Sequence, residues 1–243
     1  MNIYNKIKRR ISSNLIKKTT QLNLLKPTIS FTFDDAPNSA FINGSAILKK
    51  YGYCGTYYVS LGLKELPNSD KNYFDYTHLI KAIEDGHELG CHTYSHISLY
   101  KSKKEDVIKD LSKNQEKINE LIPNYKFKSF AYPYGEYTYN SLKVINDTFV
   151  SARTTRGGIN YNKVNLLNLR AFELSNQSDI NMLYAMIDKT IQSNGWLILN
   201  THDVEENPSQ WGCTPAYFES IVKYCYEKKI AVKKIAEVTE IIK

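Results

Sequence analysis

Three short segments of the chain carry the residue types that a hydrolytic metal site needs. Asp34 and Asp35 follow an apolar run, His92 and His96 stand four residues apart, and His202 lies in a third, distant segment. Adjacent side chains diverge, so one carboxylate can bind a metal ion while its neighbour takes a proton. The two histidines can supply nitrogen ligands, and the distant histidine can act as an acid.

The spacing of the two histidines limits the kinds of metal site that they can form. Four-residue spacing predicts that both imidazoles lie on one face of a helical turn. The segment is not the HExxH motif of zinc peptidases, because Thr93 stands where the glutamate base would be. Two histidines and one carboxylate also describe the facial triad of non-haem iron oxygenases. The second carboxylate and the third histidine favour hydrolysis, because oxygen activation requires neither a base beside the metal nor a separate acid.

The elements that must position these residues alternate along the chain. Apolar runs predict strands at 29–33, 55–60, 88–91, 129–132, 149–153 and 196–200. Helices are predicted at 39–51, 77–85, 103–122, 139–147, 179–193, 214–228 and 234–242. This alternation is typical of barrels and layered α/β folds. Asp34, His92, Tyr134 and His202 each lie at or just after the end of a predicted strand, and in a parallel barrel those ends form the face that carries the active site.

Four segments resemble the motifs of the polysaccharide deacetylases, the NodB-homology family of carbohydrate esterase type. Residues 32–37 read TFDDAP, similar to TFDDGP, and residues 92–96 read HTYSH, similar to HTxxH. Residues 131–135 read AYPYG, similar to RxPYG, and residues 199–203 resemble the family's last leucine-histidine motif. The resemblance implies an α/β fold over residues 27–243. The expected architecture is a distorted (β/α) barrel of the NodB-homology type, with its active site at the C-terminal ends of the strands.

The resemblance also implies a role for each residue. One divalent metal ion, most often Zn²⁺, would be held by Asp35, His92 and His96. Asp34 would take a proton from the attacking water, and His202 would protonate the departing amine. The backbone N–H of Tyr134 would stabilise the oxyanion, and Pro133 and Tyr134 would contact the substrate.

The chain departs from the family pattern at several positions. Ala131 replaces the arginine that holds the catalytic base by charge pairing, and Ala36 replaces a glycine. Without that arginine the pKa of the base would rise unless another cation takes its place. Arg153 and Arg156 are candidates, and we favour Arg153 because it ends a predicted strand. The family's aspartate-tryptophan motif is not evident, which leaves the partner of His202 unassigned.

These observations predict a metal-dependent hydrolase that removes an N-acetyl or N-formyl group from an amino sugar. The substrate would be a cell-surface glycan or its precursor. Two alternatives stay open, namely a catalytically impaired barrel that binds glycan and an amidase that acts on a small non-sugar amide. The impaired barrel is motivated by Ala131 and by the missing motif.

The composition is that of an ordinary globular domain. Hydrophobic residues make up 42% of the 243 residues and charged residues 23%, and no run of about 18 apolar residues predicts a membrane span. The formal charge of +7 could attract an anionic partner, but the lysines are scattered and no nucleic-acid motif accompanies them. We therefore expect no nucleic-acid binding. The four cysteines form no CxxC pair, and a bridge between Cys213 and Cys225 stays open.

Residues 1–26 read differently from the rest of the chain. Isoleucine or leucine recurs every four residues from Ile3 to Leu15 among basic neighbours, which predicts an amphipathic helix or extension. This segment could contact a membrane surface through residues 1–20, or pack on the domain. No apolar run follows the basic residues as a signal peptide would require, so we expect a cytoplasmic protein, or one peripheral to the inner face of the membrane.

Overall fold

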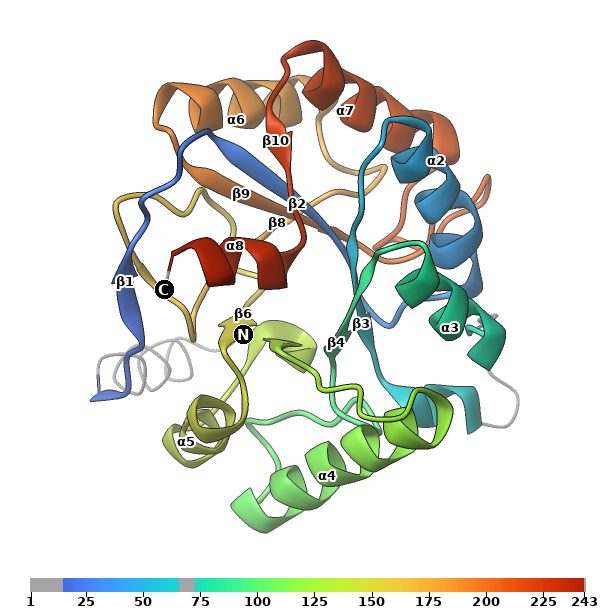
Figure 1. Ribbon diagram of the computed structural model, residues 1–243, viewed down its shortest axis with the longest axis vertical. Helices are drawn as coiled ribbons and strands as arrows, with labels where there is room; N and C mark the ends of the chain where they lie inside the picture. The colour runs from blue at the N-terminus through green and yellow to red at the C-terminus, as the bar shows by residue number, and fades with distance from the viewer. Residues whose placement is uncertain (1–14, 66–72, 243) are drawn as a thin grey trace.

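A curled sheet of parallel strands forms the centre of the molecule, surrounded by helices (Figure 1). The computed structural model describes residues 15–65 and 73–242. The strands of this sheet are β2 (Thr28–Phe33), β3 (Thr56–Val59), β4 (Glu88–Cys91), β5 (Ser129–Ala131), β6 (Ser151–Arg153), β8 (Phe172–Glu173), β9 (Trp196–Thr201) and β10 (Ala231–Val232). Neighbours follow the order β6-β5-β4-β3-β2-β9-β8, and β10 pairs with β2. Because β6 and β8 end this order, the sheet is an open, distorted barrel, as predicted.

Helices cover the outside of the sheet. They are α2 (Ser45–Lys50), α3 (Tyr76–Glu84), α4 (Lys104–Leu121), α5 (Tyr139–Thr148), α6 (Ile180–Gln192), α7 (Pro215–Glu227) and α8 (Ile235–Ile241), with the helical turns η1 (Ala40–Gly44), η2 (Leu61–Glu65) and η3 (Pro133–Gly135). In Figure 1, α8 lies across the middle of the ring that the other helices make. Within the described ranges, no helix is long and apolar enough to cross a membrane.

The central pair of strands, β2 and β9, positions two of the three chemical segments. Every residue of both strands is buried, as expected for parallel strands that are covered on both faces. They pair in register from Thr28 with Trp196 to Phe33 with Thr201. The next residues of the two strands, Asp34 and His202, therefore leave the same edge of the sheet on adjacent strands.

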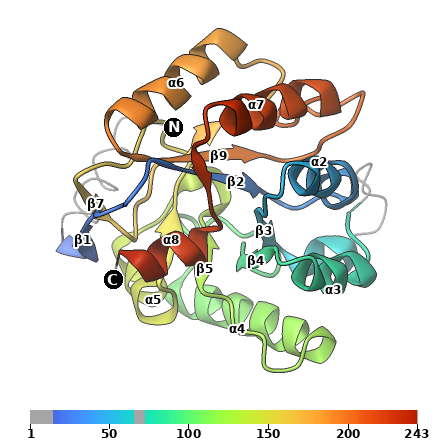
Figure 2. The same cartoon turned by 45° about the horizontal axis from the view of Figure 1, so that its top comes forward.

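Several short elements differ from the sequence-based expectation. The strand β7 (Lys163–Asn165) and the strands β8 and β10 have only two or three residues and were not predicted. The strand β1 (Thr19–Gln21) pairs antiparallel with β7, and the two lie together at one flank (Figure 2). Within the segment 1–26, predicted as an amphipathic helix or extension, residues Thr19–Gln21 are therefore extended. Its first 14 residues, including most of the predicted membrane-contact segment, lie outside the described residues. Cys213 and Cys225 are buried and unbridged.

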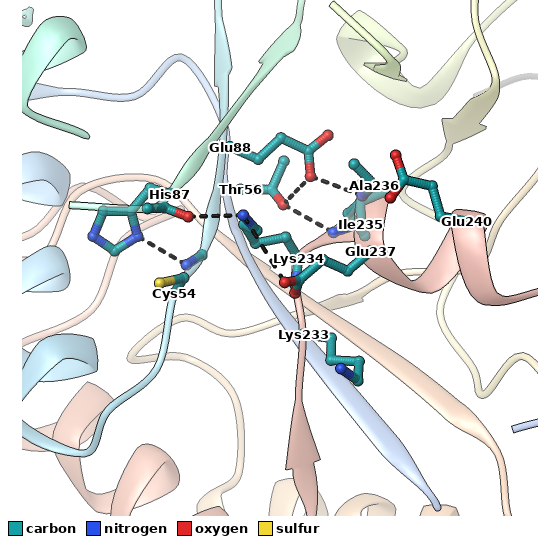
Figure 3. A network of polar contacts seen from close by, with 12 residues as sticks. Cys54, Thr56, His87, Glu88, Lys233, Lys234, Ile235, Ala236, Glu237 and Glu240 are labelled. Atoms are coloured by element: carbon teal, nitrogen blue, oxygen red, sulfur yellow. Dashed lines mark hydrogen bonds and ion pairs between the residues drawn. The ribbon is translucent and has the colours of Figure 1, made fainter. Parts of the chain in front are cut away.

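A buried carboxylate joins α8 to the starts of three strands (Figure 3). Glu88, the first residue of β4, is 6% exposed. One of its oxygens accepts a hydrogen bond from Ser129 Oγ at 2.6 Å. The other accepts from Thr56 Oγ1 and from the N–H of Ala236, both at 2.9 Å. Thr56 Oγ1 accepts in turn from the N–H of Ile235 at 3.1 Å. This network closes the barrel at the end opposite to Asp34.

We expect Glu88→Ala to lower the free energy of unfolding by about 3 kcal/mol, because two buried hydroxyl donors and one part-buried N–H donor would lose their acceptor. Glu88→Gln should cost about 1 kcal/mol, because its amide oxygen can serve two of the donors and its NH₂ group can donate to the hydroxyl of Ser129. Urea unfolding of the three proteins measures the difference. Equal stability of the two variants would show that the carboxylate does not act as the shared acceptor.

The same residue should make stability depend on pH. Burial raises the pKa of Glu88 above its ordinary value of 4.5. The folded state therefore binds this proton more tightly than the unfolded state does, and the associated stability is lost as the pH rises through the folded pKa. As the pH rises through the folded pKa of Glu88, the free energy of unfolding of the wild type should decrease relative to that of Glu88→Gln, which cannot ionise.

Candidate active site and metal centre

The two adjacent carboxylates lie where β2 ends. The N–H of Asp34 still bonds to the carbonyl of Thr201 at 2.9 Å, as a continuation of the β2–β9 pairing. The backbone then turns sharply, because Asp35 and Ala36 both have positive φ angles, 56° and 46°. Such a conformation favours glycine, so Ala36 occupies a position where the glycine of the family motif would be less strained. Both carboxylates are buried, with exposures of 4% and 8%.

Asp35, His92 and His96 converge on one point. Oδ1 of Asp35 lies 3.7 Å from Nε2 of His92 and 3.3 Å from Nε2 of His96. The three ligand atoms all lie within 4.8 Å of one another. Ligands arranged tetrahedrally at about 2.1 Å from a zinc ion are roughly 3.4 Å apart. The donor set and its spacing therefore fit a divalent cation held by these three residues.

The imidazole of His92 is oriented for ligation. Its Nδ1 lies 2.8 Å from the carbonyl oxygen of Ala131, which leaves Nε2 to face Asp35. Burial first, and then the neighbouring His96, lower the pKa of His92 to about 3. The ring is therefore neutral at physiological pH, which is the form that binds metal ions.

The loop that carries the two histidines does not form the helical turn that the four-residue spacing predicted. Thr93 and His96 have positive φ angles of 65° and 51°, which interrupt any helix. Asp110, on α4, instead accepts the N–H groups of Tyr94 at 2.6 Å and Ser95 at 3.1 Å. The rings of His92 and His96 still meet, with centroids 4.9 Å apart. A neighbouring helix, rather than local helical geometry, shapes this loop.

We expect Asp110→Ala to weaken metal binding by about 10-fold or more, because two loop N–H groups would lose the acceptor that fixes the histidine positions. Glu116→Ala is the matched control, since it removes an exposed carboxylate from the same helix. Competition with a chelator measures the affinity, and thermal unfolding verifies that both variants fold. Wild-type affinity in Asp110→Ala would contradict this role.

Arg153 supplies the cation beside Asp34. The family motif would place an arginine at residue 131 for this purpose, but that residue is alanine in this chain. Ala131 and Arg153 are register partners on β5 and β6. The side chain of Arg153 is fully buried, its Nη2 donates to Oδ1 of Asp34, and its Cζ lies 4.8 Å from the ring centroid of Tyr58. Burial lowers the pKa of Arg153 to about 9, so the guanidinium stays charged at neutral pH. Arg156, the other candidate, is exposed.

His202 follows β9 on the same face. Its ring centroid lies 6.3 Å from that of Trp211, which is 44% exposed. The neighbouring Asp203 serves its own loop, because its carboxylate accepts from the N–H of Ser209 at 2.5 Å and from its hydroxyl at 2.6 Å. Because of its distance from His202 and its exposure, Trp211 offers an aromatic ring at the rim of the site. The tertiary fold places it there, and the sequence motif does not.

Tyr134 lies at a strained turn over the histidines. Tyr134 and Gly135 have φ angles of 60° and 66°, and Pro133 is buried beneath them. The Tyr134 hydroxyl lies 3.2 Å from Nδ1 of His96, and the two rings are 4.8 Å apart. Tyr134 is 63% exposed and available to a ligand. The sequence pointed to its backbone N–H, whereas the structure also assigns its hydroxyl a contact with a candidate metal ligand.

A cavity of about 410 Å³ adjoins the site, between the segments that follow β2 and β9. Polar residues dominate its lining, which includes Asn38, Asn43, Asp203, Glu205 and Ser209. Amide, hydroxyl and carboxylate groups of this kind suit the hydroxyl groups of a sugar.

The model of the family named polysaccharide deacetylase matches residues 22–151, more than half of the chain. The chain belongs to the polysaccharide deacetylase family. The peptidoglycan-N-acetylglucosamine deacetylase of Bacillus cereus is 32% identical to this family member over 120 residues, which make up 49% of this chain and 40% of the relative. The match thus spans well under two thirds of that relative's length.

Solved structures confirm the fold of this polysaccharide deacetylase family member. A family 4 carbohydrate esterase from Bacillus anthracis superposes with a TM-score of 0.64 at 14% identity, covering 99% of this chain and 93% of the other. A pseudoenzyme of the same family, also from Bacillus anthracis, superposes with a TM-score of 0.61 at 15% identity, covering 89% and 66%. Likeness at this level of identity establishes the barrel and leaves the reaction to the residues of the site.

Proposed function

We propose that this chain is a metal-dependent amide hydrolase that removes an N-acetyl, or an N-formyl, group from an amino sugar of a surface glycan or its precursor. The observation that supports this most is the convergence of three metal-ligating side chains beside a second carboxylate, Asp34, that an arginine holds. Membership of the polysaccharide deacetylase family and the activity for which the Bacillus cereus relative is named point in the same direction.

Zinc is the ion that we assign to Asp35, His92 and His96, because two imidazoles and one carboxylate are a ligand set of catalytic zinc sites. When bound, such an ion would act as a Lewis acid toward the amide carbonyl and the attacking water. The neutral state of His92 and its bond to the carbonyl of Ala131 prepare the site for that ion.

The remaining residues divide the proton transfers. Asp34 takes a proton from the attacking water, and the buried Arg153 favours the ionised, proton-accepting form of that carboxylate. The backbone N–H of Tyr134 donates to the developing oxyanion, with Pro133 shaping the turn that aims it. His202 protonates the departing amine. The polar cavity next to Asp203 accommodates the neighbouring part of the glycan.

Purified, metal-loaded protein incubated with N-acetylated and N-formylated amino sugars and their oligomers tests the reaction class, with released acetate or formate as the readout. Turnover of an acylated amino sugar supports the proposal. Normal metal binding without release from any acylated sugar would favour the alternative of a glycan-binding barrel, which Ala131 and the pseudoenzyme neighbour motivate. Turnover of small non-sugar amides alone would favour an amidase.

We expect Arg153→Met to lower kcat by about 10²-fold, because the partner that keeps Asp34 ionised and oriented would be gone. Adding Ala131→Arg to this variant should recover much of the loss, since residue 131 is the register partner of residue 153 on the next strand. Initial rates of deacetylation measure both effects. Arg156→Met is the matched control and should keep wild-type rates. If the double variant folds and binds metal but does not recover the deacetylation rate, the cation beside Asp34 must come from β6.

A further inference from the structure

A second cavity, of about 420 Å³, lies on the flank of the barrel. The segment that joins β6 to β8 forms it, and this segment includes β7, which Figure 2 shows beside β1. Its lining includes Arg156, Tyr161, Lys163, Asn165, Asn168 and Arg170. None of the residues to which we assign a catalytic or metal-binding role lines this cavity, so the proposed deacetylation leaves it unexplained.

The charge of this cavity is uncompensated. Arg156, Lys163 and Arg170 contribute three cations, and no aspartate or glutamate lies in the lining. Among the ion pairs within the described part of the chain, none involves any of these three side chains. A concave surface with one sign of charge attracts ligands of the opposite sign.

Arg170 is held in place by the fold. Its Nη1 donates to the carbonyl of Gly157 at 3.1 Å. The side-chain amide of the buried Asn160 makes two hydrogen bonds with the backbone of Arg170. Its Nδ2 donates to the Arg170 carbonyl at 2.9 Å, and its Oδ1 accepts from the Arg170 N–H at 3.0 Å. Less freedom is therefore lost when this guanidinium binds a ligand.

The asparagine amides also offer donors rather than acceptors. Oδ1 of Asn165 accepts the N–H groups of Lys18 and Leu167, both at 3.1 Å. Oδ1 of Asn168 accepts from the hydroxyl of Tyr137 at 3.2 Å. The oxygens of both amides are thus engaged within the protein, and their NH₂ groups are the parts left to meet a ligand. Together with the three cations, these two amides suit a ligand that accepts hydrogen bonds.

We propose that this flank cavity binds a phosphoryl group, with Arg156 and Arg170 as its principal contacts. Three cations and two amide donors exceed what the two oxygens and single charge of a carboxylate can satisfy, whereas a phosphate or diphosphate offers more oxygens and more charge. Tyr161, which is 55% exposed, adds a ring face for a sugar or base attached to the phosphate. This site goes beyond the proposed deacetylation and does not rest on it.

Isothermal titration of the metal-loaded 243-residue chain with inorganic phosphate and with pyrophosphate tests the proposal. Both anions should bind the wild type. Arg156→Gln and Arg170→Gln should each weaken binding by about 10-fold, because each removes a charge-assisted pair of hydrogen bonds. The matched control is Lys109→Gln, which removes one positive charge from the exposed face of α4 and should change the affinity less than about twofold. Separate titrations with a sugar phosphate and with a nucleoside diphosphate show which of these two classes of molecule carries the phosphoryl group that the cavity binds.

Phosphate can also coordinate the catalytic metal, so His92→Ala is the decisive comparison. Binding that survives in His92→Ala and weakens in Arg156→Gln supports the flank cavity. Binding that disappears in His92→Ala and persists in both arginine variants would place the anion at the metal centre and overturn the proposal. Acetate that binds as tightly as phosphate, or a wild type that binds neither phosphate nor pyrophosphate, would overturn it as well.

Discussion

Replacing His92 with alanine is expected to remove the bound metal and to lower kcat/KM for deacetylation by at least about 10³-fold. His92 is almost fully buried, and its Nδ1 contact with the Ala131 carbonyl directs Nε2 toward the oxygen of Asp35. Without this imidazole only one nitrogen and one carboxylate ligand remain, which is too few for a stable site. Elemental analysis and released acetate measure the two effects together.

Chelation provides the independent control for this prediction. Wild-type protein stripped of metal should lose the same activity and regain it when zinc is restored, whereas His92→Ala should not regain it. His78→Ala, which alters a histidine at the start of α3, should retain both metal and turnover. Full activity in the stripped wild type would overturn the proposed metal dependence of the hydrolysis.

Asp34→Asn is expected to lower kcat by about 10²- to 10⁴-fold while the metal stays bound. Asparagine has nearly the same shape, and its amide oxygen can still accept from Nη2 of Arg153, but it cannot take a proton from the attacking water. Asp35→Asn should instead reduce the metal content, because Asp35 carries the oxygen that faces both imidazoles.

The contrast between these two variants tests the division of labour. Metal content from elemental analysis and initial rates should separate them, with turnover lost at full occupancy for Asp34→Asn and occupancy lost for Asp35→Asn. If both variants lose metal to the same extent, the two carboxylates share the ligand role and the base must be sought elsewhere.

The local sequence pattern was sufficient to predict a strand where the run of apolar residues was long. The apolar runs that became β2 and β9 are buried along their whole length, and their ends deliver Asp34 and His202 to one edge of the sheet. The strands β7 and β10 gave no such signal. They have two or three residues each, too few for a period to show, and they form because other segments pair with them.

The histidine loop shows where spacing misleads. A separation of four residues fits a helical turn, yet the backbone at Thr93 and His96 is left-handed. Asp110 holds the loop from α4, and nothing in the sequence around this helical aspartate marks it for that task. Spacing identified which histidines could act together, and a tertiary contact determined how they do so.

The sequence by itself determined the chemical inventory: two adjacent carboxylates, a pair of histidines in a second segment, a third histidine in a distant segment, and the predicted strands whose ends bring them to one face. Only the tertiary structure decided which cation stands beside Asp34. Arg153 is 119 residues away along the chain and arrives from the strand next to Ala131. A predicted strand end favoured Arg153 over Arg156, but strand register and the direction of a buried side chain depend on how the whole sheet packs, so no local pattern settles the contact.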